Sequence, residues 1–324
     1  MTFGLPPSAV SPGCAFQNDE PVSAGVSSVY RACGLTIDSA LSLPGMPVVA
    51  AAGDVIIRRG SVPSHLSGGQ GHEALWEGAD GAWLIRTGRL ARFLVIRPGH
   101  VTFAMGPEAT DDDARALLLR TPLALLVYLK GMLPLHASCV AIGSQTIALA
   151  GESGSGKSSV TMALLERGHH MLADDISAID IGADGGPIVF PSWPDVELWP
   201  DVLSRYGRDV DVLPKVRPAL SKRRVSVSEQ FISEPRPLHV VVILRTHNRA
   251  DARVERIAAG ARFKSLSRVT WVWPLLRAGG MQARHFQMVS AIERSVRIVS
   301  IARPAGRWSA DELADLIEHE ASAG

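Results

Sequence analysis

The chain has 324 residues, 46% of them hydrophobic, and its formal net charge at pH 7 is only +1. The length suffices for one large domain or for two ordinary ones, and the hydrophobic content allows a sizeable core. Because the net charge is near zero, it gives no general attraction to nucleic acid or to an anionic membrane, and we expect neither as a partner.

The cysteines and the first residues of the chain indicate the cellular compartment of the protein. Three widely spaced cysteines without a CxxC pair fit a reducing compartment and argue against a disulfide framework or a zinc site. The start of the chain lacks the basic and apolar segments of a signal peptide. Charged residues and prolines interrupt residues 114–140, so no stretch of about 18 apolar residues remains to cross a membrane. We therefore expect a cytoplasmic protein.

Residues 1–27 are rich in Pro, Ser and Gly and lack periodicity, which indicates a flexible leader. In residues 28–106, short apolar segments alternate with Gly, Pro and Asp turns, a pattern typical of a small β-rich domain. The strands that we expect there are Gly34–Ile37, Asp54–Arg58, Ala82–Arg86 and Leu90–Ile96. The region contains no group of residues with obvious chemistry, so ligand sensing, partner docking and a structural role all stay open.

A second domain, residues 107–324, is predicted to begin with two helices. Asp111 to Asp113 open the first, where three acids complement the helix dipole, and simple capping is favoured over a metal site. Thr121 followed by Pro122 resembles an N-cap with Pro at the first helical position, which predicts a second helix to about Lys130.

Two apolar strands, His136–Ile142 and Thr146–Ala150, are then separated by a three-residue turn and predict a hairpin. The second strand leads into Gly151-Glu152-Ser153-Gly154-Ser155-Gly156-Lys157-Ser158, which fits G-x-x-x-x-G-K-[ST], and a helix follows over Val160–Arg167. Strand, glycine-rich turn and helix form the context in which this motif binds the phosphates of a nucleotide such as ATP. The alternative is a Gly/Ser-rich surface turn that matches by chance.

The chemistry of this motif assigns roles to its residues. Glycines let successive N–H groups surround phosphate oxygens, Lys157 reaches the β- and γ-phosphates, and the Ser158 hydroxyl ligates Mg²⁺. The predicted nucleotide-binding residues are Gly151, Ser153, Gly154, Ser155, Gly156, Lys157, Ser158 and Ser159.

Asp174 and Asp175 lie in a predicted strand over Met171–Ile179. In a strand their side chains point to opposite faces, so two tasks are open to them. One carboxylate would support Mg²⁺ and the other would accept the proton of an attacking hydroxyl. A turn at the end of the strand, with both acids solvated, is the alternative.

Three further residues are weaker candidates. Glu197, just before a short helix near Asp201–Tyr206, is a further Mg²⁺-associated acid, or an exposed residue between packed tryptophans. Lys222 and Arg223, in a polar loop between Leu213 and Ser228, would neutralise a transferring phosphate, or form a solvated basic turn.

The rest of the chain alternates strands and helices. Strands are expected at Leu238–Arg245, Arg253–Ala258 and Val296–Ala302, and helices at Gly260–Val272 and Met281–Glu293. A capping box, Ser309 to Glu312, predicts the start of a last helix that runs to about His319.

The run from His136 to Ile179 resembles the catalytic core of the HPr kinase/phosphorylase family. Three features carry the resemblance: a His that opens a strand, a second strand that enters the glycine-rich motif, and the G-H-x-x-x-A-D-D spacing from Gly168 to Asp175. The layout is closer to shorter HPr-kinase-like proteins, some of which phosphorylate a serine of a lasso-peptide precursor. These also carry segments similar to Gly34–Gly45, Leu198–Asp201 and Lys222–Arg223.

The resemblance implies an α/β fold, a P-loop kinase of the HPr kinase/PEP carboxykinase type with a small β-rich N-terminal domain. It implies an ATP- and Mg²⁺-dependent kinase for a serine hydroxyl of a peptide or small protein. In the family the first or the second Asp of the pair acts as the base. Of the two we expect Asp175 to be the base and Asp174 to support the metal, with His136 in contact with the phosphate or the acids. The segment after Glu197 lacks the Arg-Gly-Leu-Gly-like motif of the long-form enzyme, which bears on the phosphorylase reaction and on HPr recognition.

Two other functions stay open, a kinase for a small-molecule hydroxyl and a nucleotide-binding regulator without transfer chemistry. The family also forms hexamers, so a homo-oligomer is left open.

Overall fold

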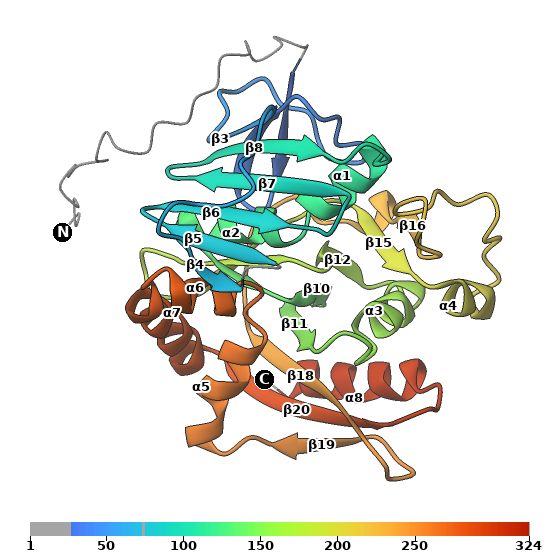
Figure 1. Cartoon of the computed structure of the whole chain (residues 1–324). Helices are drawn as coiled ribbons and strands as arrows, with labels where there is room; N and C mark the ends of the chain where they lie inside the picture. Colours follow the sequence, from blue (N-terminus) through green and yellow to red (C-terminus); the bar gives the residue numbers. More distant parts are fainter. Residues whose placement is uncertain (1–26, 73–74, 324) are drawn as a thin grey trace.

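The computed structural model describes residues 27–72 and 75–323. The expected leader, except for its last residue, lies outside the described residues. Within the described part the fold is mixed α/β, and its strands form four sheets (Figure 1).

The N-terminal region forms an eight-stranded sheet in the order β1-β2-β3-β8-β7-β6-β5-β4. Its strands are β1 (Ser28–Ala32), β2 (Leu35–Ser39), β3 (Val55–Arg59), β4 (Gln70–His72), β5 (Trp76–Ala79), β6 (Ala82–Arg86), β7 (Ala91–Ile96) and β8 (His100–Met105). The β-rich composition of this region and the four expected strands are confirmed, whereas β1, β4, β5 and β8 were not expected. Its status as a separate domain stays a prediction.

Helices α1 (Asp111–Leu118) and α2 (Thr121–Leu129) follow this sheet. A capping box begins α1, because the Thr110 hydroxyl accepts from the Asp113 amide while the Asp113 carboxylate accepts from the Thr110 amide. Arg120, rather than the expected Thr121, is the residue that precedes the first turn of α2. Every residue of α2 from Pro122 to Tyr128 is buried.

The burial of α2 from Pro122 to Tyr128 has a simple cause. The helix contacts β7 of the N-terminal sheet and also β9 (Leu133–Leu135), and it lies between the N-terminal sheet and the C-terminal strands (Figure 1). A helix that is apolar on all sides is one that is covered on all sides. In the described residues no helix is long and apolar enough to span a membrane.

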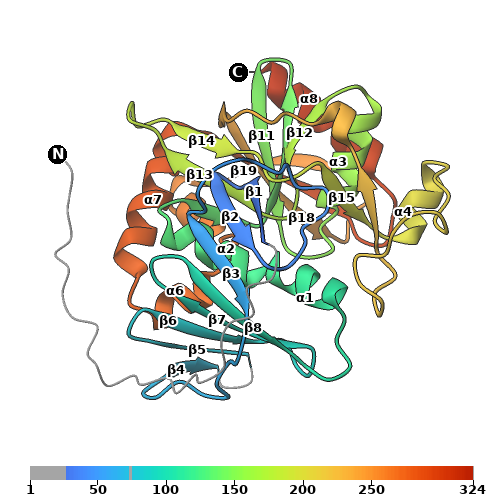
Figure 2. The same ribbon diagram turned by 90° about the horizontal axis from the view of Figure 1, so that it is seen from above.

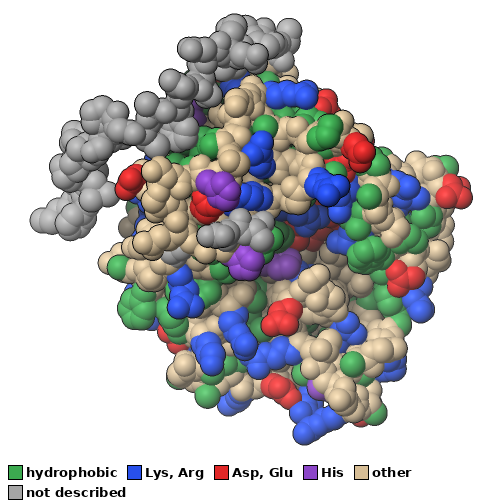
Figure 3. All heavy atoms as spheres, viewed as in Figure 1, with side chains coloured by type: hydrophobic (Ala, Val, Ile, Leu, Met, Phe, Trp, Pro, Cys, Tyr) green, Lys and Arg blue, Asp and Glu red, His purple; other side chains and the backbone are tan. Residues whose placement is uncertain are grey.

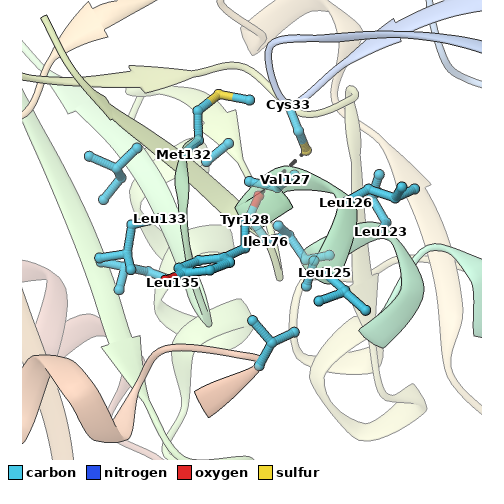
Figure 4. Packing of buried hydrophobic residues seen from close by; sticks show 14 of the residues in the cluster. Cys33, Leu123, Leu125, Leu126, Val127, Tyr128, Met132, Leu133, Leu135 and Ile176 are labelled. Carbon is cyan, nitrogen blue, oxygen red and sulfur yellow. Dashed lines mark hydrogen bonds between the residues drawn. The ribbon is translucent and has the colours of Figure 1, made fainter. Parts of the chain in front are cut away.

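One hydrophobic cluster joins the two halves of the described chain. It contains Phe93 of the N-terminal sheet, Tyr128 of α2, and Val241 from a C-terminal strand. Figure 4 shows the side chains of α2 within it, next to Cys33, whose thiol lies 4.0 Å from the carbonyl oxygen of Ile176.

The C-terminal region is built on a six-stranded sheet in the order β12-β10-β11-β18-β20-β19. Its strands are β10 (Ala137–Ile142), β11 (Gln145–Gly151), β12 (His170–Ala173), β18 (Val240–His247), β19 (Arg253–Arg256) and β20 (Arg297–Pro304). The predicted hairpin is confirmed, because β10 and β11 pair antiparallel. The parallel trio β11, β18 and β20 forms the centre of the sheet, and α3 (Lys157–Glu166) packs against α8 (Ala310–Ser322) beside it (Figure 1).

Two smaller sheets complete the fold (Figure 2). Their strands are β9, β13 (Ser177–Ile181), β14 (Pro187–Phe190) and β17 (Arg236–Pro237) in one sheet, and β15 (Asp195–Leu198) and β16 (Arg223–Ser226) in the other. The remaining helices are α4 (Pro200–Arg205), the short 3-10 helix η1 (Ser228–Gln230), α5 (Ala259–Arg268), α6 (Trp273–Ala278) and α7 (Gln282–Ser295).

The expected strand over residues 171–179 is wrong. The chain leaves β12 at Ala173 and re-enters a different sheet at Ser177, so the two aspartates lie in the turn between them. Asp175 has φ +67°, a left-handed conformation that ends a strand and that Asp tolerates better than most residues. The turn, and not the alternation of a strand, separates the directions of the two carboxylates.

Three other expectations also need correction. The polar loop of residues 213–228 contains β16, which pairs with β15. The helix expected over residues 260–272 forms as α5 but ends at Arg268, and a second helix that was not expected, α6, begins at Trp273 with Pro274 in its first turn. The capping box at Ser309 does not form, since the Ser309 side chain makes no capping hydrogen bond. The Glu312 carboxylate, its expected second half, instead accepts from the Ala252 amide at 2.8 Å and from Arg307 at 2.6 Å.

The covered position of α2 generates a stability prediction. Leu125→Ala removes a fully buried side chain, so we expect the free energy of unfolding to fall by about 2–5 kcal/mol. The matched control is Val212→Ala, at a residue whose surface is 75% exposed, which we expect to change stability by about 0.5 kcal/mol or less. Denaturant unfolding measures both, and equal effects of the two substitutions would contradict the packing described.

Candidate active site

The glycine loop, residues Gly151–Ser158, connects β11 to α3. Gly154 and Gly156 have φ angles of +80° and +103°, a conformation that glycine adopts without strain. A Cβ on Gly151 would come within 2.7 Å of the Leu244 carbonyl oxygen, so the close approach of the loop to β18 also requires glycine. Gly156 precedes the first turn of α3, whose N–H groups have no acceptor within the helix.

Arg303, at the end of β20, binds the outer side of the glycine loop. Its Nε donates to the Ser155 carbonyl oxygen at 2.8 Å, and its Nη2 donates to the Gly154 carbonyl oxygen at 2.8 Å. Because the C=O and N–H of one trans peptide point in opposite directions, these bonds turn the amide of Gly156 away from the guanidinium. Arg303 therefore fixes the peptide orientation on which an anion site in this loop depends.

Lys157 lies folded along the same loop. Its Nζ donates to the carbonyl oxygen of Gly151 at 2.8 Å and to that of Glu152 at 3.3 Å, and only 7% of the residue surface is exposed. Burial lowers the pKa of Lys157, while the nearby carboxylates of Asp175 and Asp174 act in the opposite direction. A buried ammonium with mainly carbonyl partners is well placed to accept the negative oxygens of a polyphosphate.

A cavity of about 620 Å³ opens over the glycine loop. It brings together ten of the sequence-predicted residues: His136, Ser153, Gly154, Gly156, Lys157, Ser158, Ser159, Asp175, Glu197 and Lys222. On the face drawn in Figure 3, basic and acidic side chains lie together in a hollow, next to a group of hydrophobic side chains. The volume is within the roughly 300–1,000 Å³ range that small-molecule sites occupy.

Four sequence-predicted residues do not line this cavity: Gly151, Ser155, Asp174 and Arg223. Gly151 and Ser155 belong to the glycine loop behind its surface, and the Ser155 hydroxyl is buried without a partner among the described residues. Arg223 is turned away, since its Nε donates to the Val210 carbonyl oxygen at 2.9 Å.

Arg120 organises the carboxylates of the cavity. Its Nη1 lies 2.6 Å from Asp175 Oδ2 and its Nη2 lies 2.6 Å from Glu197 Oε2. His136 Nε2 lies 3.2 Å from the other oxygen of Asp175. Burial favours a raised pKa for Asp175, but the hydrogen bond from His136 and the charge of Arg120 outweigh it and hold this pKa below its usual range. Asp175 is therefore ionised at neutral pH.

Asp174 has a different environment. Its Oδ1 accepts from the Ser138 hydroxyl at 2.5 Å and its Oδ2 from the Glu197 amide at 3.4 Å, and only 4% of its surface is exposed. Burial raises the pKa of Asp174 to about 6, and the neighbouring charge of Asp175 adds to the rise. The two aspartates are adjacent in sequence, yet one faces the cavity and the other holds β10 and β15 together behind it.

Lys222 and two tryptophans border the carboxylates. Lys222 Nζ lies 3.8 Å from Glu197 Oε2 and 5.7 Å from the centre of the Trp199 ring. The ring of Trp271 packs edge-on against His136 with centres 4.3 Å apart, which fixes the imidazole beside Asp175. We call Arg120, His136, Asp175, Glu197 and Lys222 the acid end of the cavity.

The residues present fit a nucleotide and Mg²⁺. The glycine loop, the start of α3 and Lys157 provide donors for phosphate oxygens at the cavity wall. In the described residues, no group of three or more His, Cys, Asp or Glu side chains could hold a metal ion. Mg²⁺ at phosphate sites needs only one or two protein ligands, and the Ser158 hydroxyl at the cavity wall meets that requirement.

The sequence analysis missed Arg120, Arg303 and Trp271. The sequence contained one indication of the position of Arg120, because this residue directly precedes the Thr-Pro pair that begins α2. Arg303 carries no motif, and only the pairing of β20 beside β18 brings it to the glycine loop. Trp271 reaches His136 because Val269 accepts a hydrogen bond from the His136 amide at 2.7 Å.

Comparison with known proteins gives a distant likeness among solved structures. No protein-family model matches the chain, and a search of the curated proteins finds no match. Among solved structures, the HPr(Ser) kinase/phosphatase from Coxiella burnetii is similar, with 15% sequence identity and a TM-score of 0.29. The match covers 57% of this chain and 91% of that chain. The activity proposed for this chain rests on its own residues.

The position of Arg303 predicts an effect on phosphate binding. Arg303→Gln removes two charge-assisted hydrogen bonds to the glycine loop, so we expect the affinity for inorganic tripolyphosphate to fall by about tenfold or more. Calorimetric titration measures the affinity. The control is Arg253→Gln, which breaks an ion pair with Glu255 on β19 and should leave the affinity unchanged. An Arg303→Gln protein that binds like the parent would show that the loop orients itself without this residue.

The environment of Asp174 predicts a pH effect on stability. The folded protein raises the pKa of Asp174 from 3.8 to about 6, so between these values the folded state holds a proton that the unfolded chain has released. The contribution of Asp174 to the free energy of unfolding therefore falls as the pH rises from about 4 to about 6, by up to about 3 kcal/mol.

Asp174→Asn keeps acceptor geometry for Ser138 but cannot ionise. We expect the stability of the parent protein, minus that of this variant, to decrease across this pH window in denaturant unfolding. A difference in stability that stays constant from pH 4 to pH 7 would contradict a raised pKa for the buried carboxyl of Asp174.

Proposed function

We propose that the protein is an ATP- and Mg²⁺-dependent kinase that transfers phosphate to a serine hydroxyl of a peptide or small protein. The observation that carries this proposal is that Lys157, Ser158 and the ionised Asp175 line one cavity. Phosphoryl transfer requires donors for the phosphates and a group that accepts the hydroxyl proton, and this cavity offers both. The resemblance of residues 136–179 to the HPr kinase/phosphorylase core supports the same reaction.

The residues of the cavity have separate roles in the proposed reaction. Amides of the glycine loop and Lys157 bind the phosphates, and Arg303 keeps those amides oriented. Mg²⁺, held by Ser158 and phosphate oxygens, would neutralise charge on the transferring group. As the serine oxygen forms its bond to the γ-phosphorus and ADP leaves, the hydroxyl proton passes to Asp175. His136 and Arg120 hold the carboxylate of Asp175 in position.

The acceptor is proposed as a peptide or small protein, with a lasso-peptide precursor as one example, and not as nucleic acid or membrane. Trp199, 46% exposed at the edge of the cavity, supports this choice because exposed aromatic residues are common contact points for peptides. Lys222 beside it would neutralise the transferring group. A cytoplasmic location fits both the thiols and this substrate.

A nucleotide-binding regulator without transfer chemistry is the second candidate. Arg120 favours it, because this guanidinium engages the carboxylates of both Asp175 and Glu197 at 2.6 Å. An enzyme has to let Asp175 accept a proton in spite of that ion pair. Turnover of ATP in the presence of an acceptor separates the two candidates.

The kinase proposal predicts a separation of binding from transfer. Asp175→Asn should lower the rate of phosphate transfer by about 100-fold or more, because it removes the proton acceptor, while ATP affinity changes by no more than about threefold. Mass spectrometry of serine peptides incubated with protein, ATP and Mg²⁺ measures transfer, and titration measures binding.

Asp180→Asn, on β13 and outside the cavity, is the matched control and should transfer phosphate at the parent rate. Transfer that persists in Asp175→Asn would remove this residue from the reaction. ATP binding without any turnover in the parent protein, across the acceptors tried, would favour the regulator.

A further inference from the structure

We infer that the part of the cavity formed by α4 and the start of α8 binds the nucleoside of the phosphate donor, by stacking a planar purine base against the paired side chains of Arg205 and Trp308. This inference rests on the proposed function and extends it to the recognition of the donor. We call Val202, Arg205, Trp308, Ala310 and Leu313 the aromatic end of the cavity.

The lining of the cavity comes from two sets of elements. Asp175, Glu197 and Lys222 come from the β12–β13 turn, from β15 and from the residue before β16, whereas the aromatic end is formed by α4 and by the start of α8. A polyphosphate on the glycine loop must direct its terminal phosphorus toward Asp175 for transfer to occur. Its other end, which carries the nucleoside, then lies away from Asp175, and the aromatic end is a part of the same cavity to which Asp175, Glu197 and Lys222 do not belong.

The aromatic end has the chemistry that a base requires. The guanidinium carbon of Arg205 lies 4.8 Å from the centre of the Trp308 ring, so two planar groups are already stacked at the cavity wall. The Tyr206 ring packs edge-on against Trp308 with centres 6.2 Å apart and holds the indole in place. Val202 and Leu313 are buried apolar neighbours that also line the cavity. Bases stack on aromatic rings and on guanidinium planes whatever their sequence identity.

Arg205 is free to act on a ligand. It is exposed, and its guanidinium has no hydrogen-bond or ion-pair partner among residues 27–72 and 75–323. At the acid end, by contrast, Arg120 is committed to two carboxylates at 2.6 Å and Lys222 lies 3.8 Å from Glu197. The cations of the acid end are thus paired with carboxylates, whereas the exposed guanidinium of Arg205 lies over the Trp308 ring, an arrangement on which a planar group can stack.

The test compares a donor that has a base with one that lacks it. ATP and inorganic tripolyphosphate are titrated, each with Mg²⁺, into the full-length parent protein, Arg205→Ala and Trp308→Phe. We expect Arg205→Ala to weaken ATP binding by about tenfold and tripolyphosphate binding by about twofold or less. Trp308→Phe keeps an aromatic ring in the packing and should weaken ATP binding by a smaller factor.

Arg208→Ala is the matched control, since Arg208 is a nearby exposed arginine that pairs with Glu166 and does not line the cavity. It should bind both ligands like the parent. ATP, but not tripolyphosphate, should also change the tryptophan fluorescence of the parent, and most of that change should disappear in Trp308→Phe.

The outcomes separate this inference from the proposed function. Equal losses for ATP and tripolyphosphate in Arg205→Ala would assign Arg205 to the phosphates and overturn the base site, as would no loss for either ligand. A parent protein that binds ATP through these residues but never transfers phosphate would overturn the kinase and keep the base site. A parent protein that binds neither ligand would overturn both.

Discussion

The ion pairs of Arg120 are the constraint on which the candidate site depends. Two carboxylates from different elements, Asp175 and Glu197, face one cavity because a single guanidinium lies 2.6 Å from each. Without that cation, two negative groups at a half-buried wall would repel each other and would be poorly solvated. The hydrogen bond from His136 and the charge of Arg120 together hold the pKa of Asp175 below its usual range, so the contact that builds the site also supports its chemistry.

The packing of α2 explains how Arg120 is held. Arg120 directly precedes this helix, whose residues are buried between the N-terminal sheet and the C-terminal strands (Figure 1). A residue at the end of so firmly packed a helix has little freedom to move. The eight-stranded sheet therefore has a structural part in the site, although it contributes no side chain to the 620 Å³ cavity.

Local signals in the sequence were sufficient for part of the site. The spacing of Gly151, Gly156, Lys157 and Ser158 between a strand and a helix predicted the glycine loop, because such motifs act through their own backbone. The sequence did not predict the parts of the site that depend on pairing between strands far apart in the chain. A strand pattern was expected through Asp174 and Asp175, but β12 and β13 pair in different sheets, so the chain must turn there.

Arg303 shows the same limit in another way. Its role depends on the register of β20 beside β18, and the residues around it contain no motif. Arg205 and Trp308 are about a hundred positions apart and meet only in the folded chain.

The structure of the protein bound to a non-hydrolysable ATP analogue and Mg²⁺ tests the central claim most directly. The account predicts phosphates on the amides of residues 153–159, with the γ-phosphate facing Asp175. A nucleotide bound elsewhere, or one whose γ-phosphate points to α8, would contradict it.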